Sequence, residues 1–92
     1  MVLAPVRIPV AIEYCAPCEY LPQAVELGHH LLFEFQGYIK TMSLVPASQG
    51  IFNVYIGDEL VYSNENKETF PRLEEMKQAF RRRLKEMTGE EA

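Results

Sequence analysis

The stretch Val10-Ala11-Ile12-Glu13-Tyr14-Cys15-Ala16-Pro17-Cys18 decides the fold, because a strand pattern in it runs directly into a pair of cysteines. Residues 10–14 are rich in β-branched and aromatic side chains, which predicts a strand, and Pro9 marks its start. Apolar side chains then recur every three or four residues from Tyr20 to Phe35, which predicts a helix over residues 18–36. The cysteine pair therefore lies where a strand ends and a helix begins.

Three further elements follow along the chain. The patterns predict a strand over residues 38–45, a hairpin over residues 51–63 closed by Gly57-Asp58, and a helix over residues 71–88. A single crossover helix between the first two strands makes these strands parallel, with a right-handed connection. The chain of 92 residues forms one domain, residues 1–92. The sequence thus predicts an α/β, thioredoxin-like βαβ-ββα fold: a four-stranded mixed sheet with two helices packed mainly on one face.

Composition and charge exclude several classes of function. A formal net charge of -4 provides no attractive field for phosphate backbones, so we expect no nucleic-acid partner. No apolar run approaches the roughly 18 residues of a membrane span, and the N-terminal stretch lacks the pattern of a signal peptide. We therefore expect a cytoplasmic protein that binds no membrane, and the residues indicate no cofactor and no metal.

Cys15 and Cys18 are the candidate catalytic residues, because two cysteines separated by two residues are typical of a redox pair. Near a helix N-terminus, where Pro17 fits the first turn, unpaired amides and the positive end of the dipole favour the thiolate. The second thiol can then resolve a mixed disulfide. This argument makes Cys15 the expected attacking thiol, so Cys15→Ser should remove disulfide exchange. Glu13 and Glu19 flank the motif, and we expect moderate thiol acidity.

Other interpretations of the polar motifs stay open at this point. A structural zinc site would need His29 and His30 beside the two cysteines, but neighbouring helix residues point about 100° apart. The cysteines could also be a purely structural pair of buried thiols. The basic run Arg81-Arg82-Arg83 suits the C-terminal half of a helix, and an anionic partner is the alternative.

One face of the sheet should be uncovered. Only five residues, Pro46 to Gly50, separate the second strand from the hairpin, which leaves no room for another helix. Strand alternation across the two-residue turn places four apolar residues on this face: Ile51, Tyr55, Leu60 and Tyr62. We expect it to bind a second copy of the chain or a protein partner. The alternative function is therefore a non-catalytic interaction module whose partner contact is switched by the redox state of the cysteines.

Four segments of the chain match, in order, the motifs of one known family. The most informative is Tyr14-Cys15-Ala16-Pro17-Cys18-Glu19-Tyr20, which is similar to the motif Y-C-x-x-C/U-x-aromatic, where U is selenocysteine. The other three are Gly50-Ile51-Phe52-Asn53-Val54 for G-x-F-E-V, Leu60-Val61-Tyr62-Ser63 for L-v-x-S, and Phe70-Pro71 for F-P. Together these segments resemble the Rdx family, which includes selenoproteins W, T and H and cysteine-containing bacterial relatives.

The resemblance, closest to the selenoprotein W type, implies a thioredoxin-like fold with a CxxC redox centre that acts on protein or glutathione disulfides. Family members that contain selenocysteine place it at the second position of the motif, which here is Cys18. Asn53 replaces the usual glutamate, Asn64 stands where lysine commonly follows the serine, and the absence of selenium disfavours fast peroxide chemistry. Thioredoxins also carry a cis-proline that faces the motif, for which Pro46 is the nearest candidate.

Overall fold

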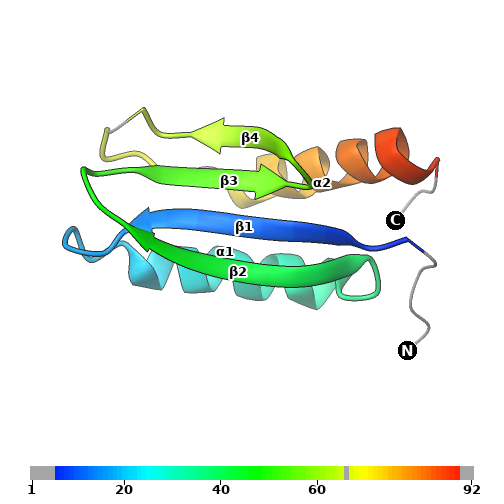
Figure 1. Ribbon diagram of the computed structural model, residues 1–92, viewed down its shortest axis with the longest axis horizontal. Coiled ribbons are helices and arrows are strands. Elements are labelled where there is room, and N and C mark those ends of the chain that lie inside the picture. Colours follow the sequence, from blue (N-terminus) through cyan, green and yellow to red (C-terminus); the bar gives the residue numbers. More distant parts are fainter. Residues whose placement is uncertain (1–5, 66, 90–92) are drawn as a thin grey trace.

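The computed structural model describes residues 6–65 and 67–89. Figure 1 shows the order of the elements: β1 (Ile8–Cys15), α1 (Leu21–Phe35), β2 (Ile39–Ala47), β3 (Phe52–Ile56), β4 (Glu59–Ser63) and α2 (Leu73–Thr88). The strands form one sheet in the order β2-β1-β3-β4. β1 is parallel to β2 and antiparallel to β3, and β3 is antiparallel to β4. This confirms the predicted α/β fold with a mixed four-stranded sheet.

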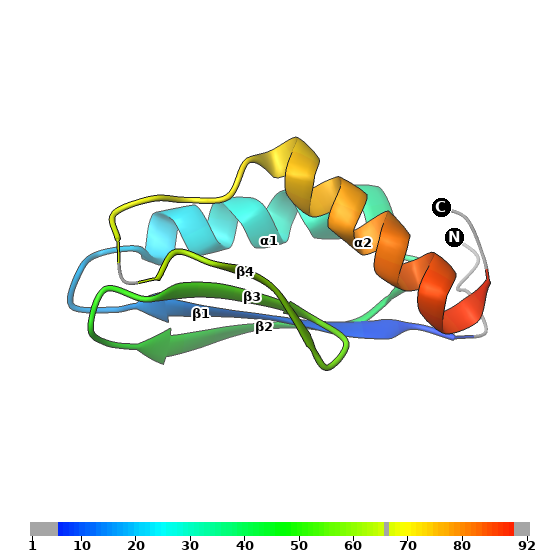
Figure 2. The ribbon, with the colours of Figure 1, turned by 90° about the horizontal axis from the view of Figure 1, so that it is seen from above.

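Both helices lie on the same face of the sheet, which Figure 2 shows from the side. α1 contacts β1 and β2, whereas α2 contacts β3 and α1. The opposite face carries no helix within the described residues. Neither described helix has the length and apolar character that would let it cross a membrane.

The core forms between this helix pair and the sheet. Side chains of β1 and β3 alternate between buried and more exposed, so each strand contributes every second residue to the core. The rings of Phe35 in α1 and Phe80 in α2 stack at 4.6 Å between their centroids, which joins the two helices. The largest fully buried side chains are Ile8, Val10, Ile12, Leu31, Phe35, Phe52, Val54, Ile56, Phe80 and Leu84.

β1 begins earlier and ends later than the sequence predicts, at Ile8 and Cys15 instead of residues 10 and 14. Its pairing with β2 shifts register between Ile8 and Pro9, because proline has no N–H to donate to the ladder. The carbonyl of Pro9 still accepts a hydrogen bond of 2.8 Å from the Gly57 amide. Pro9 therefore marks an irregularity inside the strand and not its start.

The first helix begins at Leu21, three residues later than predicted, and ends at Phe35 instead of residue 36. Residues 16–19 form a turn, and Glu19 adopts a left-handed backbone with φ of 63°, which an α-helix does not accommodate. Pro22 occupies the first helical turn, the position that we had assigned to Pro17. The cysteine motif consequently precedes the helix and is not part of it.

The second strand also extends beyond its predicted end. β2 runs from Ile39 to Ala47, and Pro46 pairs with Tyr14 of β1, so the turn before β3 begins at Ser48. β2 is an edge strand, where the missing N–H of a proline is tolerated. No cis peptide bond occurs in the described residues, so Pro46 is not the cis-proline considered above.

A bulge in the hairpin changes which residues share a face. Gly57, with φ of 68°, and Asp58 form the two-residue turn. Val54 pairs with Tyr62, but its neighbour Tyr55 pairs with Leu60, so Val61 is the extra residue. Tyr62 therefore lies on the helix-covered face with Val54, and its hydroxyl is hydrogen bonded to that of Thr69 at 3.3 Å. The predicted placement of Tyr62 on the uncovered face was wrong, because strict alternation ignores the bulge.

The second helix begins at Leu73 and not at residue 71, after an Arg72 with extended backbone, and Gly89 caps its end with φ of 78°. The arginine run ties this helix to other elements through ion pairs. Arg81 pairs with Glu34 of α1, whereas Arg82 and Arg83 pair with Glu59 and Glu86. These contacts account for the basic run without an anionic partner.

Candidate redox site

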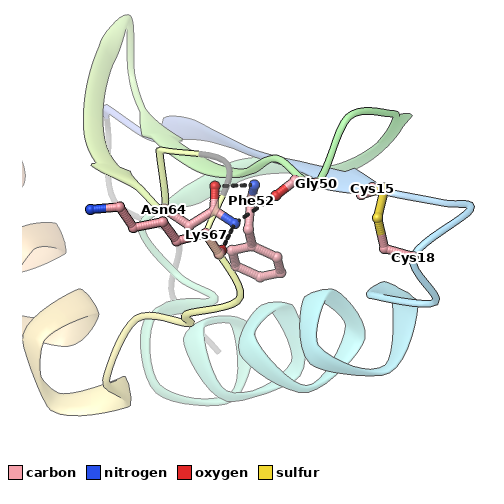
Figure 3. The surroundings of a disulfide bond; sticks show 6 residues. All are labelled: Cys15, Cys18, Gly50, Phe52, Asn64 and Lys67. Carbon is pink, nitrogen blue, oxygen red and sulfur yellow. Dashed lines mark hydrogen bonds between the residues drawn. A yellow bond between two sulfur atoms is a disulfide. The ribbon is translucent and has the colours of Figure 1, made fainter.

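Cys15 and Cys18 are joined by a disulfide across the four-residue turn that follows β1, as Figure 3 shows. Cys15 is the last residue of β1, a strand paired on both sides, whereas Cys18 lies in the turn. Their Cα atoms are 5.3 Å apart, within the usual 4.4–6.8 Å range for a disulfide. The sequence thus brings the two predicted site residues into direct bonding contact.

Backbone hydrogen bonds fix this turn to the strands on either side. The Cys15 amide donates to the Ile51 carbonyl at 2.9 Å, and the Ala16 amide donates to the Ala47 carbonyl at 3.0 Å. Within the turn, the Tyr20 amide donates back to the Cys15 carbonyl at 3.3 Å. The motif is therefore held from both neighbouring chain segments and has a defined position at one end of the sheet.

The two sulfur-bearing residues differ sharply in their access to solvent. Cys15 is 1% exposed, whereas Cys18 is exposed. Disulfide exchange requires an attacking sulfur to reach the sulfur of another molecule along the bond axis. Of the two cysteines, only Cys18 offers such access in this structure, which favours Cys18 over the predicted Cys15 as the attacking thiol.

The helix argument also favours Cys18. α1 starts at Leu21, so Cys18 lies three residues before the helix and Cys15 lies six residues before it. This helix has no side-chain N-cap hydrogen bond and no acidic residue in its first turn. No capping carboxylate therefore compensates the positive end of the helix dipole next to the motif. Because the effect of the dipole falls off within about one turn, it stabilises a thiolate at Cys18 more than one at Cys15.

Glu13 lies on the uncovered face, two residues before Cys15 on β1. Its carboxylate accepts a hydrogen bond of 3.3 Å from the Asn53 amide on β3. A hydrogen bond to the same carboxylate, with burial as a second cause, holds the pKa of Tyr55 above its ordinary value of 10.0. Asn53 thus donates a hydrogen bond to Glu13. The glutamate that is usual at this position of the family motif would instead place a second carboxylate beside Glu13.

Asn64, directly after β4, is a buried polar residue near the motif, and nothing in the sequence predicts its contacts. The residue is 3% exposed. Its side-chain oxygen accepts from the Phe52 amide at 2.9 Å, and its nitrogen donates to the carbonyls of Gly50 at 2.8 Å and Lys67 at 2.6 Å. Figure 3 shows these bonds to the left of the disulfide. Asn64 therefore holds the segment whose Ile51 carbonyl anchors Cys15.

The two histidines do not join the cysteines. His29 is exposed on α1, and the His30 imidazole lies 3.9 Å from the Glu26 carboxylate one turn away. Within residues 6–65 and 67–89, no three His, Cys, Asp or Glu side chains come close enough together to hold a metal ion. The zinc interpretation therefore finds no ligand set in the described part of the chain.

Comparison with known proteins agrees with this geometry. The family model described as Rdx family matches residues 9–82. The crystal structure of a selenoprotein W-related protein from Vibrio cholerae shares the fold, with a TM-score of 0.80 and 23% identity over 85% of this chain and 98% of that one. A crystal structure from Bordetella parapertussis gives a TM-score of 0.80 and 28% identity over 85% of this chain and 99% of that one. The curated proteins contain no match. The chain belongs to the Rdx family.

Proposed function

We propose that the protein is a thiol–disulfide redox protein in which Cys18 exchanges with a partner and Cys15 resolves the mixed disulfide. The observation that supports it most is the Cys15–Cys18 bond between a buried and an exposed cysteine at the position of the family motif. The assignment follows from access: the reacting sulfur must meet a second molecule, whereas the resolving sulfur need only reach its neighbour.

The exchange needs no reactant other than the protein dithiol and the partner disulfide. In the reduced protein the Cys18 thiolate attacks one sulfur of a partner disulfide, and the other partner sulfur leaves as a thiolate that takes up a proton. The Cys15 thiolate then attacks the Cys18 sulfur, forms the bond found in this structure and releases the first partner sulfur. The protein dithiol is oxidised and the partner disulfide is reduced. The reverse sequence oxidises a partner dithiol.

Single serine variants test the assignment of the two roles. Cys15→Ser retains the proposed attacking thiol but cannot resolve, so it should accumulate a mixed disulfide with glutathione or a peptide, visible as a mass increase that a reductant removes. Cys18→Ser should accumulate none, because its remaining thiol is buried. A stable adduct on Cys18→Ser, with none on Cys15→Ser, would restore the opposite order of attack.

A second experiment tests whether Cys15 and Cys18 interconvert between dithiol and disulfide. The wild-type protein is equilibrated in glutathione redox buffers, alkylated and measured by mass spectrometry. A reversible internal disulfide between Cys15 and Cys18 is the expected result. If the two cysteines stay reduced across the whole range of buffers, the redox function is wrong.

The second candidate function is a redox-switched interaction module that uses the uncovered face. Leu60 is 47% exposed and Val45 39% exposed on this side of the molecule, which favours a contact with a protein or a second copy. The centre of the face is polar, however, because Glu13 and Asn53 are hydrogen bonded there. Light scattering of oxidised and reduced protein, with Leu60→Ser as the variant, tests this candidate: a monomer in every sample would exclude self-association.

A further inference from the structure

A pocket of about 240 Å³ opens between α1 and the segment that leads into α2. Apolar side chains form most of its wall, from the start of β3, from α1 and from the beginning of α2. Polar side chains come from the same face of α1, at intervals of three and four residues. The lining consists of Gln23, Glu26, Leu27, His30, Phe52, Phe70, Pro71 and Leu73.

This pocket is connected to the disulfide through directly contacting residues. Phe52 follows Ile51, whose carbonyl accepts the hydrogen bond from Cys15. Tyr20, two residues after Cys18, meets the Phe70 ring edge-on at 5.0 Å, and Phe70 meets Phe52 edge-on at 5.2 Å. Figure 3 shows the Phe52 ring between the sheet and α1 at the end of the molecule that carries the disulfide. The aromatic contacts of Tyr20, Phe70 and Phe52 therefore link the wall of the pocket to the chain segment that follows Cys18.

The size of the pocket suits one large side chain. Pockets for small-molecule ligands usually enclose about 300–1,000 Å³, and this one is smaller. An apolar cavity of about 150 Å³ already accommodates a benzene ring, so 240 Å³ is sufficient for a phenylalanine, tyrosine or methionine side chain. One wall of the pocket is rigid, because Phe52 is packed in the core at 1% exposure and its backbone amide is fixed by Asn64.

Charge at the rim favours a basic neighbour for that side chain. The Glu26 side chain is 76% exposed at the mouth, and the lining includes no lysine or arginine. Glutathione disulfide is anionic and has no large apolar side chain, so it matches neither the pocket nor its rim.

We propose that this pocket docks a large apolar side chain of a protein partner whose exchanging cysteine lies next to that side chain and to a lysine or arginine. The proposal rests on the proposed redox function and names its substrate class: protein disulfides with apolar and basic surroundings. The chemistry is the exchange through Cys18 described above. The pocket contributes by positioning the partner sulfur, in the way that remote binding groups orient a reacting centre.

The proposal is tested by measuring how fast the reduced protein reduces three different disulfides. The first is a peptide disulfide with phenylalanine and lysine near the cysteine, and the second carries alanine and glutamate in those places. The third is glutathione disulfide. We expect the first peptide to react about tenfold faster than the second, which is the size of effect that partial burial of one aromatic side chain produces.

Two variants and a control link any preference to the pocket. Gln23 is an exposed lining residue, so Gln23→Trp should fill the mouth without disturbing the core and remove most of the preference. Gln78→Trp adds the same side chain at an exposed position of α2 outside the lining and should leave the preference unchanged. Glu26→Lys should slow the lysine peptide and leave glutathione disulfide at or above its original rate.

The outcomes separate the pocket from the redox function. If Cys18-dependent reduction of all three disulfides proceeds at similar rates, or if Gln23→Trp leaves a preference intact, the docking proposal is wrong while the redox function stands. If none of the disulfides is reduced, the redox function fails and the substrate class fails with it. A preference for the first peptide that Gln23→Trp abolishes and Gln78→Trp preserves supports the pocket.

Discussion

The amide of Cys15 donates a 2.9 Å hydrogen bond to the carbonyl of Ile51, one residue before β3 begins. The strand ladder between β1 and β3 thereby continues to the first cysteine of the motif. Ile51 itself is held between two residues that Asn64 binds, because the Asn64 side chain contacts the carbonyl of Gly50 and the amide of Phe52. The buried side chain of Asn64 thus fixes the segment to which the cysteine turn is hydrogen bonded.

Replacing Asn64 with alanine should lower the free energy of unfolding by about 3 kcal/mol, since the Phe52 amide and the Gly50 carbonyl lose their side-chain partner, whereas the Lys67 carbonyl keeps its bond from the Thr69 amide. Urea denaturation of the oxidised protein measures the loss. Ser63→Ala is the control, because the Ser63 hydroxyl only accepts an exposed 3.2 Å bond from the Glu65 amide, and it should cost less than about 1 kcal/mol. Similar losses for the two variants would contradict a supporting role for Asn64.

Cys18 should be the first cysteine to react in the reduced protein. A substoichiometric amount of iodoacetamide should modify it at least about tenfold faster than Cys15, because Cys15 is 1% exposed and Cys18 is exposed. Peptide mapping by mass spectrometry gives the ratio. Equal modification of both cysteines would show that the difference in access is lost when the disulfide opens.

Glu19 adopts a left-handed conformation with φ of 63°, which glycine adopts more readily than any residue with a side chain. Glu19→Gly should therefore be more stable than Glu19→Ala by about 1 kcal/mol in the oxidised protein, although both variants remove the same carboxylate. Thermal unfolding of the pair provides the measurement. An alanine variant as stable as the glycine variant would mean that the turn does not require this conformation.

The ion pair between Glu34 and Lys77 should make part of the stability depend on pH. A hydrogen bond from Lys77, at 2.9 Å, lowers the pKa of Glu34 below its ordinary value of 4.5 against the opposing effect of desolvation. A carboxyl with a lowered folded pKa stabilises the fold above its unfolded pKa, and this contribution is lost as the pH falls through the folded value.

The stability gap between wild type and Glu34→Gln should thus be present at neutral pH and shrink as the pH is taken below 4.5. Urea denaturation at a series of pH values measures this gap. Glu75→Gln, a carboxylate removed from the first turn of α2, serves as the control for general charge effects. A gap that stays constant into the acid range would exclude the ion pair as its source.

The sequence was sufficient for the fold and for the pairing of Cys15 with Cys18. The core stripe of α1 and the motif depend on spacing, which the sequence displays directly. Features that depend on backbone irregularity could not be predicted in this way. Because Glu19 has a left-handed backbone, α1 begins after it. Because Val61 is the extra residue of the bulge, Tyr62 lies on the face that the helices cover. Neither residue is glycine, so neither position carries the usual signal of a turn or a bulge.

Access to the two cysteines could not be predicted either. The distance of a cysteine from a helix start bears on the dipole field at its sulfur and carries no information about its burial. Cys15 is 1% exposed in the folded chain, and the role of Asn64 comes from partners that are distant in the sequence, at Gly50 and Phe52. A single asparagine after a strand gives no signal for such contacts, because most asparagines in that place simply form turns.

The anchoring of Cys15 in the central strand has a consequence for how the molecule changes oxidation state. Both neighbouring segments hold the backbone of residues 15 and 16 through hydrogen bonds that do not involve sulfur, so opening the disulfide leaves them intact. We therefore expect oxidised and reduced forms to share one scaffold, with rearrangement confined to the turn that carries Cys18. The disulfide exchange that we propose would require little structural reorganisation at such a site, so its rate should be set by the encounter with a partner and not by a slow refolding of the protein.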